Sequence, residues 1–113
     1  CLLDKSVNTG YYILDLTYYE IGNVVLKHLK KLKTIDEEQA NSLIDITGNW
    51  NNVLFVQRND LQEIFKIASK LEITYYDATY VYFTKKHNAA LKTSDKELYE
   101  KSKKFCRVEL MSI

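Results

Sequence analysis

Short runs of β-branched and aromatic residues alternate along this sequence with longer segments whose apolar residues recur at helical spacing. The predicted strands cover residues 11–15, 53–56, 89–93 and 106–111. The predicted helices cover residues 17–33, 34–48, 59–71, 74–86 and 94–104. Strands separated by helices favour parallel pairing through right-handed crossovers. The alternation therefore predicts an α/β fold in which helices flank a parallel, doubly wound sheet.

Capping signals set the ends of the predicted helices. Thr34 and Glu37 have the spacing of a capping box, which opens the second helix, and Gly48 ends it. Asp60 and Asp95 stand just before two later helices and are expected to cap them.

The length of 113 residues predicts a single domain covering residues 1–113. Apolar residues make up 46% of the chain, which is enough for a core. No stretch approaches the ~20 apolar residues of a membrane span, and no secretory signal pattern is present. We therefore expect a cytoplasmic protein.

The charge balance excludes a strongly basic, dedicated nucleic-acid binder, because sixteen basic residues face fifteen acidic ones. The basic residues nevertheless gather in two runs, Lys27 with Lys30, Lys31 and Lys33, and Lys101 with Lys103 and Lys104. A solvated helix face is the favoured interpretation of these runs, and a patch that contacts phosphate is the alternative.

Cysteine and histidine give no motif. Cys1 and Cys106 lack metal or redox spacing, so reduced thiols are expected rather than a disulfide. His28 and His87 have no companion at ligand spacing, so a structural zinc site is not expected. No Ser–His or Cys–His pair is evident to supply a covalent nucleophile.

Two segments of the chain have similar sequences. Residues 16–24 read Leu-Thr-Tyr-Tyr-Glu-Ile-Gly-Asn-Val, and residues 73–81 read Ile-Thr-Tyr-Tyr-Asp-Ala-Thr-Tyr-Val. In both, a threonine stands three residues before a carboxylate, Glu20 or Asp77, at the start of a predicted helix. Each pair taken alone is explained by a capping box.

A third acid, Asp95, favours a binding site over separate caps. It lies where a predicted strand ends and a helix begins, and open α/β sheets collect their ligands at the carboxyl ends of the strands. Crowded carboxylates repel one another, and oxygen ligands suit hard ions such as Mg²⁺ or Mn²⁺. The pattern therefore indicates a divalent-metal site built from Glu20, Asp77 and Asp95.

The same segments resemble the PIN-domain family of ribonucleases, of the VapC-toxin type. Residues 16–24 look like the family segment in which an acid opens the helix after the second strand. Residues 71–81 resemble its "L-T-x-Y-D-A-x-Y" run, and residues 91–98 resemble its "L-V-T-x-D-x-x-L" run. The separation of eighteen positions from Asp77 to Asp95 matches the family, and the resemblance covers nearly the whole chain.

The resemblance implies a PIN-like fold and a metal-dependent endoribonuclease. Glu20, Asp77 and Asp95 would be metal ligands or water-positioning acids, Thr93 would support the site, and Mg²⁺ or Mn²⁺ would be the cofactor. RNA would be the substrate, an antitoxin protein the inhibitor, and a homodimer the assembly. The alternative is a catalytically degenerate PIN-like module that binds RNA or a protein partner without cleavage.

The sequence departs from the family pattern at the position of the family's first acid. Residues 2–7 look like the family run that closes its first strand, but Asp4 stands only sixteen residues before Glu20, too few for the intervening helices. We expect residues 1–8 to be the tail of a helix ended by Gly10, and the family's first strand to lie upstream. The sheet should then show either a gap or a rearranged pairing that involves residues 1–15.

Overall fold

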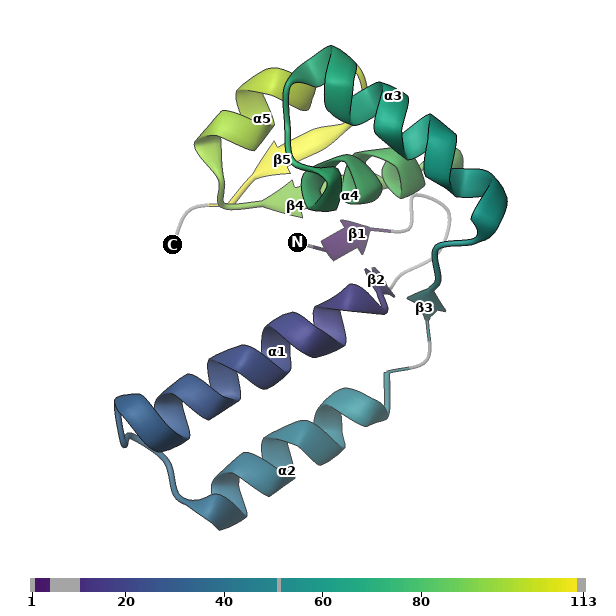
Figure 1. Cartoon of the computed structure of the whole chain (residues 1–113). Helices are drawn as coiled ribbons and strands as arrows, with labels where there is room; N and C mark the ends of the chain where they lie inside the picture. The colour runs from purple at the N-terminus through teal and green to yellow at the C-terminus, as the bar shows by residue number, and fades with distance from the viewer. Residues whose placement is uncertain (1, 5–10, 51, 112–113) are drawn as a thin grey trace. The chain divides into compact units, whose positions relative to one another are not determined.

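The computed structural model describes residues 2–4, 11–50 and 52–111, with the elements labelled as in Figure 1. The chain divides into two compact units: Cys1–Ile13 together with Phe55–Ile113, and Leu14–Leu54. No helix among the described residues is long and apolar enough to cross a membrane.

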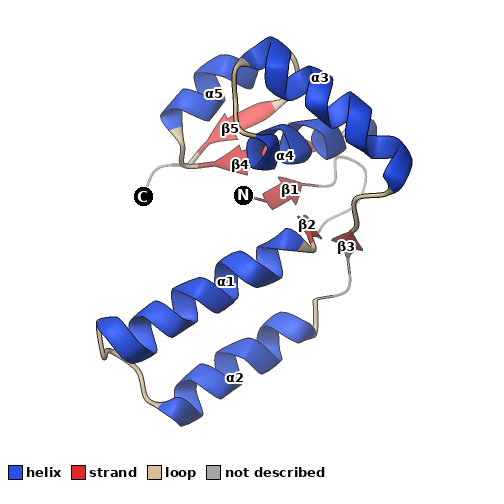
Figure 2. Ribbon diagram, viewed as in Figure 1, coloured by secondary structure: helices blue, strands red, loops and turns tan. Residues whose placement is uncertain are grey.

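The first unit contains a sheet whose strands run in the order β2-β1-β4-β5 (Figure 2). The strands are β1 (Leu2–Asp4), β2 (Tyr11–Leu14), β4 (Ala90–Thr93) and β5 (Val108–Leu110). β1 is antiparallel to both β2 and β4, whereas β4 and β5 are parallel. Lys92 and Glu109 stand opposite each other on the parallel pair, and their side chains form an ion pair.

The sheet is mixed, so the prediction of a wholly parallel, doubly wound sheet is wrong for these strands. The reason lies in the length of the connection. Only residues 5–10 separate β1 from β2, and a parallel pair needs a crossover of about a dozen residues or more. A short connection therefore imposes antiparallel pairing.

The N-terminal residues correct a second expectation. Residues 2–4 form strand β1 and not the tail of a helix, while residues 5–8 and Gly10 lie outside the described residues. β1 lies between β2 and β4 and is antiparallel to both, while the position of the family's first strand upstream stays a prediction.

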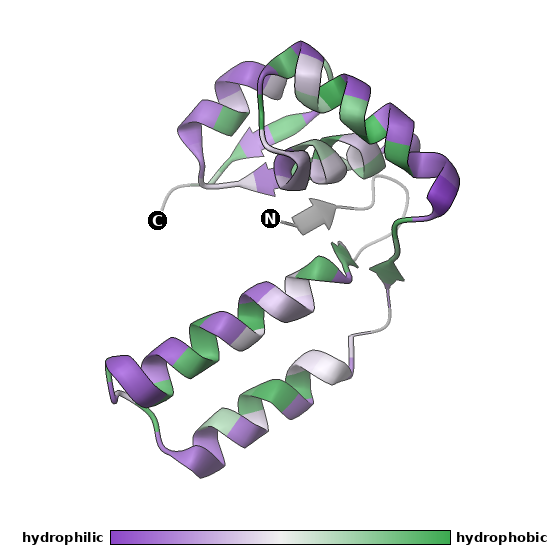
Figure 3. Cartoon of the chain, viewed as in Figure 1, coloured by the Kyte–Doolittle hydropathy of each residue, from purple (hydrophilic) through white to green (hydrophobic). Residues whose placement is uncertain are grey.

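Three helices complete the first unit: α3 (Leu61–Leu71), α4 (Tyr75–Lys86) and α5 (Lys96–Ser102). A short 3₁₀ turn, η2 (Arg58–Asp60), precedes α3. α4 is the central helix, because it buries Ala78, Tyr80, Val81 and Phe83. α3 alternates hydrophobic and hydrophilic residues along its length (Figure 3) and packs on α4. It buries Ile64 and Ile67 and leaves Leu61 and Phe65 exposed.

The second unit is a helical hairpin. α1 (Leu16–Leu26) continues into a π-helical segment, η1 (Lys27–Lys31), and packs against α2 (Glu37–Gly48). β3 (Val53–Leu54) follows, and the Leu54 carbonyl accepts a hydrogen bond from the Asp15 N–H. The hairpin buries Val25 and Ala40, and its exposed apolar residues include Tyr19, Val24, Leu26, Leu32, Leu43, Ile44 and Ile46.

Two predicted capping boxes are misplaced in this hairpin. α2 is capped by Asp36, whose carboxylate accepts the Gln39 N–H at 2.8 Å while the Gln39 side chain accepts the Asp36 N–H. Thr34 instead hydrogen-bonds the His28 ring. α1 begins at Leu16 with Asp15 as its N-cap, so Thr17 lies inside the helix and does not cap it.

A buried carboxylate joins α3 to α4. Asp60 is 1% exposed, and it accepts hydrogen bonds from the Tyr82 hydroxyl at 2.6 Å, the Gln57 N–H at 2.8 Å and the Lys86 ammonium at 3.2 Å. Burial alone would raise the pKa of Asp60, but the three donors and the Lys86 charge together hold it below its ordinary value of 3.8. Asp60 therefore stays ionised inside the protein, and it is not the side-chain cap of α3 that the sequence suggested.

A smaller aromatic contact joins β2 to the end of α4. The His87 ring lies 5.1 Å from the Tyr12 ring and 6.0 Å from the Phe83 ring, centroid to centroid. Burial, with the nearby Lys86 ammonium, lowers the pKa of His87. The imidazole is therefore neutral at pH 7 and packs as an aromatic ring.

We predict that Asp60→Asn lowers the free energy of unfolding at pH 7 by about 1–3 kcal/mol, because charge-assisted hydrogen bonds are lost inside the unit. Since the folded-state pKa of Asp60 lies below 3.8, its stabilisation is present above that value and is lost as the pH falls through the folded pKa. Urea unfolding between neutral and acid pH measures both effects.

The matched control is Lys86→Met, which removes a half-exposed partner and should cost less than Asp60→Asn. Equal losses for the two variants, or no loss for Asp60→Asn, would contradict this account.

Candidate functional site

Asp77 is positioned by the start of α4. Thr74 is the N-cap of that helix, and its hydroxyl accepts the Asp77 N–H at 3.1 Å, as the sequence predicted. Asp77 is half-buried, and the helix N-terminus stabilises its ionised form by about 0.3–1 kcal/mol. The carboxylate is thus held on the first turn of the most buried helix of the unit.

Asp95 is positioned by the end of β4. It is the N-cap of α5, where its carboxylate accepts the Leu98 N–H at 3.1 Å. The Thr93 hydroxyl, which is 2% exposed, accepts the Asp95 N–H at 3.1 Å. Thr93 therefore fixes the turn that carries Asp95, and its support of a metal site stays a prediction.

The two acids meet in one pocket of about 100 Å³. Its lining comprises Glu72, Ile73, Thr74, Asp77, Asp95, Glu97, Leu98 and Lys101. The pocket lies beyond the carboxyl end of β4, beside the start of α4, where α/β folds place their ligands. The structure thus brings together two of the three acids that the sequence singled out.

Glu20 belongs to the other unit. It lies in the second turn of α1 and is exposed. Its convergence with Asp77 and Asp95 stays a prediction.

Asp4 ends β1 at the opposite end of β4 from Thr93. The antiparallel register pairs the Asp4 backbone with Ala90, the first residue of β4. The acid pocket is associated with the last residue of that strand and with Asp95. Whether Asp4 or an upstream residue is the family's first acid stays a prediction.

A lysine that sequence analysis assigned to a solvated run lines the pocket. The Lys101 ammonium donates to the Glu72 carbonyl at 2.8 Å and pairs with the Glu97 carboxylate at 2.9 Å. Glu72 ends α3 in the left-handed conformation, with φ 54°, a backbone geometry that costs a residue with a side chain about 1–2 kcal/mol. The Glu97–Lys101 spacing of four residues, one turn after Asp95, was the available signal for this pair.

The donor set of the pocket suits a hard divalent cation. Among the residues that the structure describes, no three His, Cys, Asp or Glu side chains are grouped to hold a metal ion. Mg²⁺ is commonly held by one or two carboxylates, with water and substrate phosphate completing its six ligands. Asp77 and Asp95 fit that mode of binding, which leaves open positions for a phosphodiester.

A wider depression, of about 700 Å³, is lined by no carboxylate among the described residues. Its lining residues are Gln57, Arg58, Asn59, Leu61 and Gln62, whose side chains offer amides and one guanidinium. Cys106 is a free, partly buried cysteine, and burial raises the pKa of its thiol to about 11. It is therefore protonated at pH 7 and is not an activated nucleophile.

We predict that Asp95→Asn leaves stability within about 0.5 kcal/mol of wild type, because asparagine caps helices as well as aspartate, whereas Asp95→Ala costs about 1 kcal/mol. Thermal unfolding of the two variants measures the difference. A large loss for Asp95→Asn would mean that the charge, and not the cap, holds the turn.

Comparison with known proteins shows similarity to curated proteins and to a solved structure. Ribonuclease VapC3 of Pyrobaculum aerophilum is 32% identical over 92 residues, which cover 80% of this chain and 70% of the relative. Exonuclease VapC9 of the same organism is 32% identical over 101 residues, covering 89% of this chain and 74% of the relative. The crystal structure of PAE2754 from Pyrobaculum aerophilum is similar with a TM-score of 0.68 and 31% identity, over 86% of this chain and 64% of that one. No family model matches the sequence.

Proposed function

Because this chain belongs to the VapC family of PIN-like nucleases, we propose that it is a metal-dependent endoribonuclease whose cation is held by Asp77 and Asp95. The observation that carries the proposal is the pocket that both carboxylates line at the end of β4. Glu20 is proposed as the third acid, on the strength of its family resemblance and its place near the start of α1.

The residues of the pocket have separate tasks in the proposed reaction. Asp77 and Asp95 would hold Mg²⁺ or Mn²⁺, which lowers the pKa of a bound water and offsets the charge of the phosphate. Thr93 and Thr74 fix the backbone that carries the two acids. Lys101 places a positive charge at the rim, where it favours the approach of a phosphodiester to a carboxylate-lined pocket.

The alternative is a PIN-like module that binds RNA or a protein without cutting. Only two of the three acids that the sequence singled out line the pocket, and this favours the alternative, because a metal with fewer carboxylate ligands is held less tightly. Whether bound RNA is cleaved distinguishes the two candidate functions.

We predict that the chain cleaves labelled single-stranded RNA with Mn²⁺ and stops when the metal is chelated. Asp77→Asn and Asp95→Asn should lower the rate by roughly 100-fold or more, since loss of even an outer-shell partner of a metal costs 10–100-fold. Glu20→Gln should also lower it. Calorimetric titration with Mn²⁺ checks that the affected step is metal binding.

Glu100→Gln is the control, because Glu100 lies on α5, the helix that Asp95 caps, and is ion-paired with Lys103. Unchanged cleavage by Asp77→Asn and Asp95→Asn would refute the assignment of the site. RNA binding without any cleavage by the wild-type chain would support the alternative function.

We also propose that the chain acts as a homodimer and is inhibited by an antitoxin protein, as its family suggests. Exposed apolar side chains support an assembly of this kind. Leu61, Phe65 and Tyr75 surround a depression of about 430 Å³ on α3 and α4, and Phe65 is 64% exposed. Apolar residues gathered on a surface mark protein interfaces.

We predict that sedimentation gives a dimer, and that Phe65→Asp weakens it more than Lys66→Asp does, because only the phenyl ring would be buried. A monomer across a wide concentration range would contradict the assembly. Equal effects of the two variants would move the interface away from this depression.

A further inference from the structure

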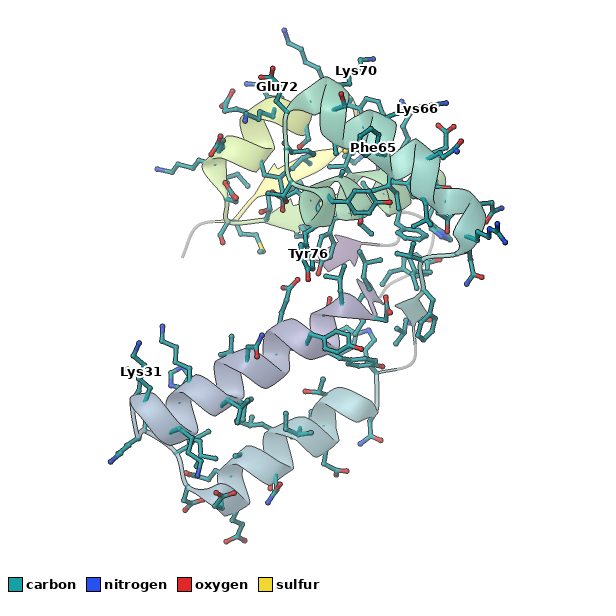
Figure 4. All side chains as sticks on the ribbon, in the orientation of Figure 1. Lys31, Phe65, Lys66, Lys70, Glu72 and Tyr76 are labelled. Atoms are coloured by element: carbon teal, nitrogen blue, oxygen red, sulfur yellow. The ribbon has the colours of Figure 1, made fainter. Side chains whose placement is uncertain are left out.

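A set of lysines comes from three helices of the first unit, α5, α3 and α4, and one of them, Lys101, lines the acid pocket. Lys101 lies on α5, and its ammonium contacts the carbonyl of Glu72, the residue that ends α3. Lys70 stands two residues before Glu72 near the end of the same helix (Figure 4). We call Lys101, Lys70 and Lys85 the lysine track.

Phe105 connects the second and third members of the track. The Lys70 ammonium lies 5.8 Å from the centroid of the Phe105 ring, and the Lys85 ammonium lies 4.2 Å from it. Lys85 also donates to the Phe105 carbonyl at 3.4 Å. Cation–π attraction and this hydrogen bond hold two ammonium groups around one ring.

Lys70 and Lys85 are the track cations that keep their capacity to bind anions, because Lys101 is ion-paired with Glu97. Over the residues described, neither Lys70 nor Lys85 forms an ion pair with a carboxylate, whereas Lys66 and Lys103 are paired with Glu63 and Glu100. An ammonium has three donor positions. Lys101 uses two of its donors on Glu72 and Glu97.

We propose that the lysine track binds the phosphodiester backbone of single-stranded RNA that flanks the segment in the acid pocket. This inference rests on the proposed function, and it adds the path by which the strand leaves the site. A chain of regularly spaced phosphates is the ligand that matches several cations together with a pocket suited to one phosphodiester. The contacts are electrostatic, so the track sets affinity and direction and does not read sequence.

The test measures binding by fluorescence anisotropy with Ca²⁺ in place of Mg²⁺ or Mn²⁺, so that a cation is available to the acid pocket, and the RNA is checked to remain uncut. The probes are a labelled single-stranded RNA of about 12 nucleotides, a length within the usual span of single-strand sites, and a labelled fragment of about 3 nucleotides that occupies the pocket alone. The full chain is compared with Lys70→Gln/Lys85→Gln. The matched control is Lys66→Gln/Lys103→Gln, which changes the net charge equally but removes ion-paired lysines.

The track variant should bind the longer RNA severalfold more weakly and the short fragment as wild type does. The slope of log affinity against log salt should fall by about 1.4, or 0.7 for each lost phosphate contact on a single strand. Lys70→Arg/Lys85→Arg should restore affinity, and thermal unfolding should show all variants folded.

Equal losses in the track and control variants would overturn the proposal, because the effect would then be one of net charge. A track variant whose affinity falls equally for the long and the short RNA would overturn it too. So would a track variant that loses affinity for polyglutamate, an acidic polypeptide, but keeps its affinity for RNA. A wild-type chain that binds long RNA through the track but never cleaves it would leave the track standing and refute the proposed function alone.

Discussion

The ionised carboxylate of Asp60 is the interaction that sets the geometry of the first unit. A buried charge is stable only when it is paired and hydrogen-bonded inside the protein. Tyr82 and Lys86, one turn apart on α4, and the Gln57 N–H before η2 supply those donors. The carboxylate therefore fixes where α3 begins relative to the end of α4. The opposite ends of the same two helices, Glu72 and Thr74, then line the acid pocket.

Sequence patterns predicted what depends on neighbouring residues. Gly48 ends α2, Thr74 caps α4 and Asp95 caps α5, because each signal acts within one helical turn. The box predicted at Thr34 failed because Asp36 and Gln39 offer the same spacing two residues later. The pairing of β1 with β4 was beyond local rules, since it joins Leu3 to Leu91 across most of the chain. Apart from β1, which was expected to be the tail of a helix, the order of helices and strands was readable from the sequence. Of the strand pairings, the parallel one between β4 and β5 agrees with the predicted parallel sheet.

The candidate site likewise contains residues that the local sequence predicted and residues that it did not. Asp77 and Asp95 were found because both stand at helix starts, and helix starts gather where strands of an α/β sheet end. Lys101 was hidden in a lysine run that looked like a solvated face, and only its contact with the Glu72 carbonyl separates it from Lys103 and Lys104. Phe105, Lys70 and Lys85 come from three separate segments. No spacing in the sequence could have grouped them.

The net charge of +1 hides a separation of charge that matters for a nuclease. In the proposed reaction, the carboxylates that would hold a cation would also repel a polyanion, so an acid pocket alone would bind RNA poorly. Cations placed beside the pocket solve this conflict when they are not neutralised by carboxylates of their own. Lys70 and Lys85 meet that condition among the described residues, while Lys66 and Lys103 do not. Overall charge therefore informs solubility and steering, whereas the partners of each lysine decide whether a strand of RNA can be held at the site.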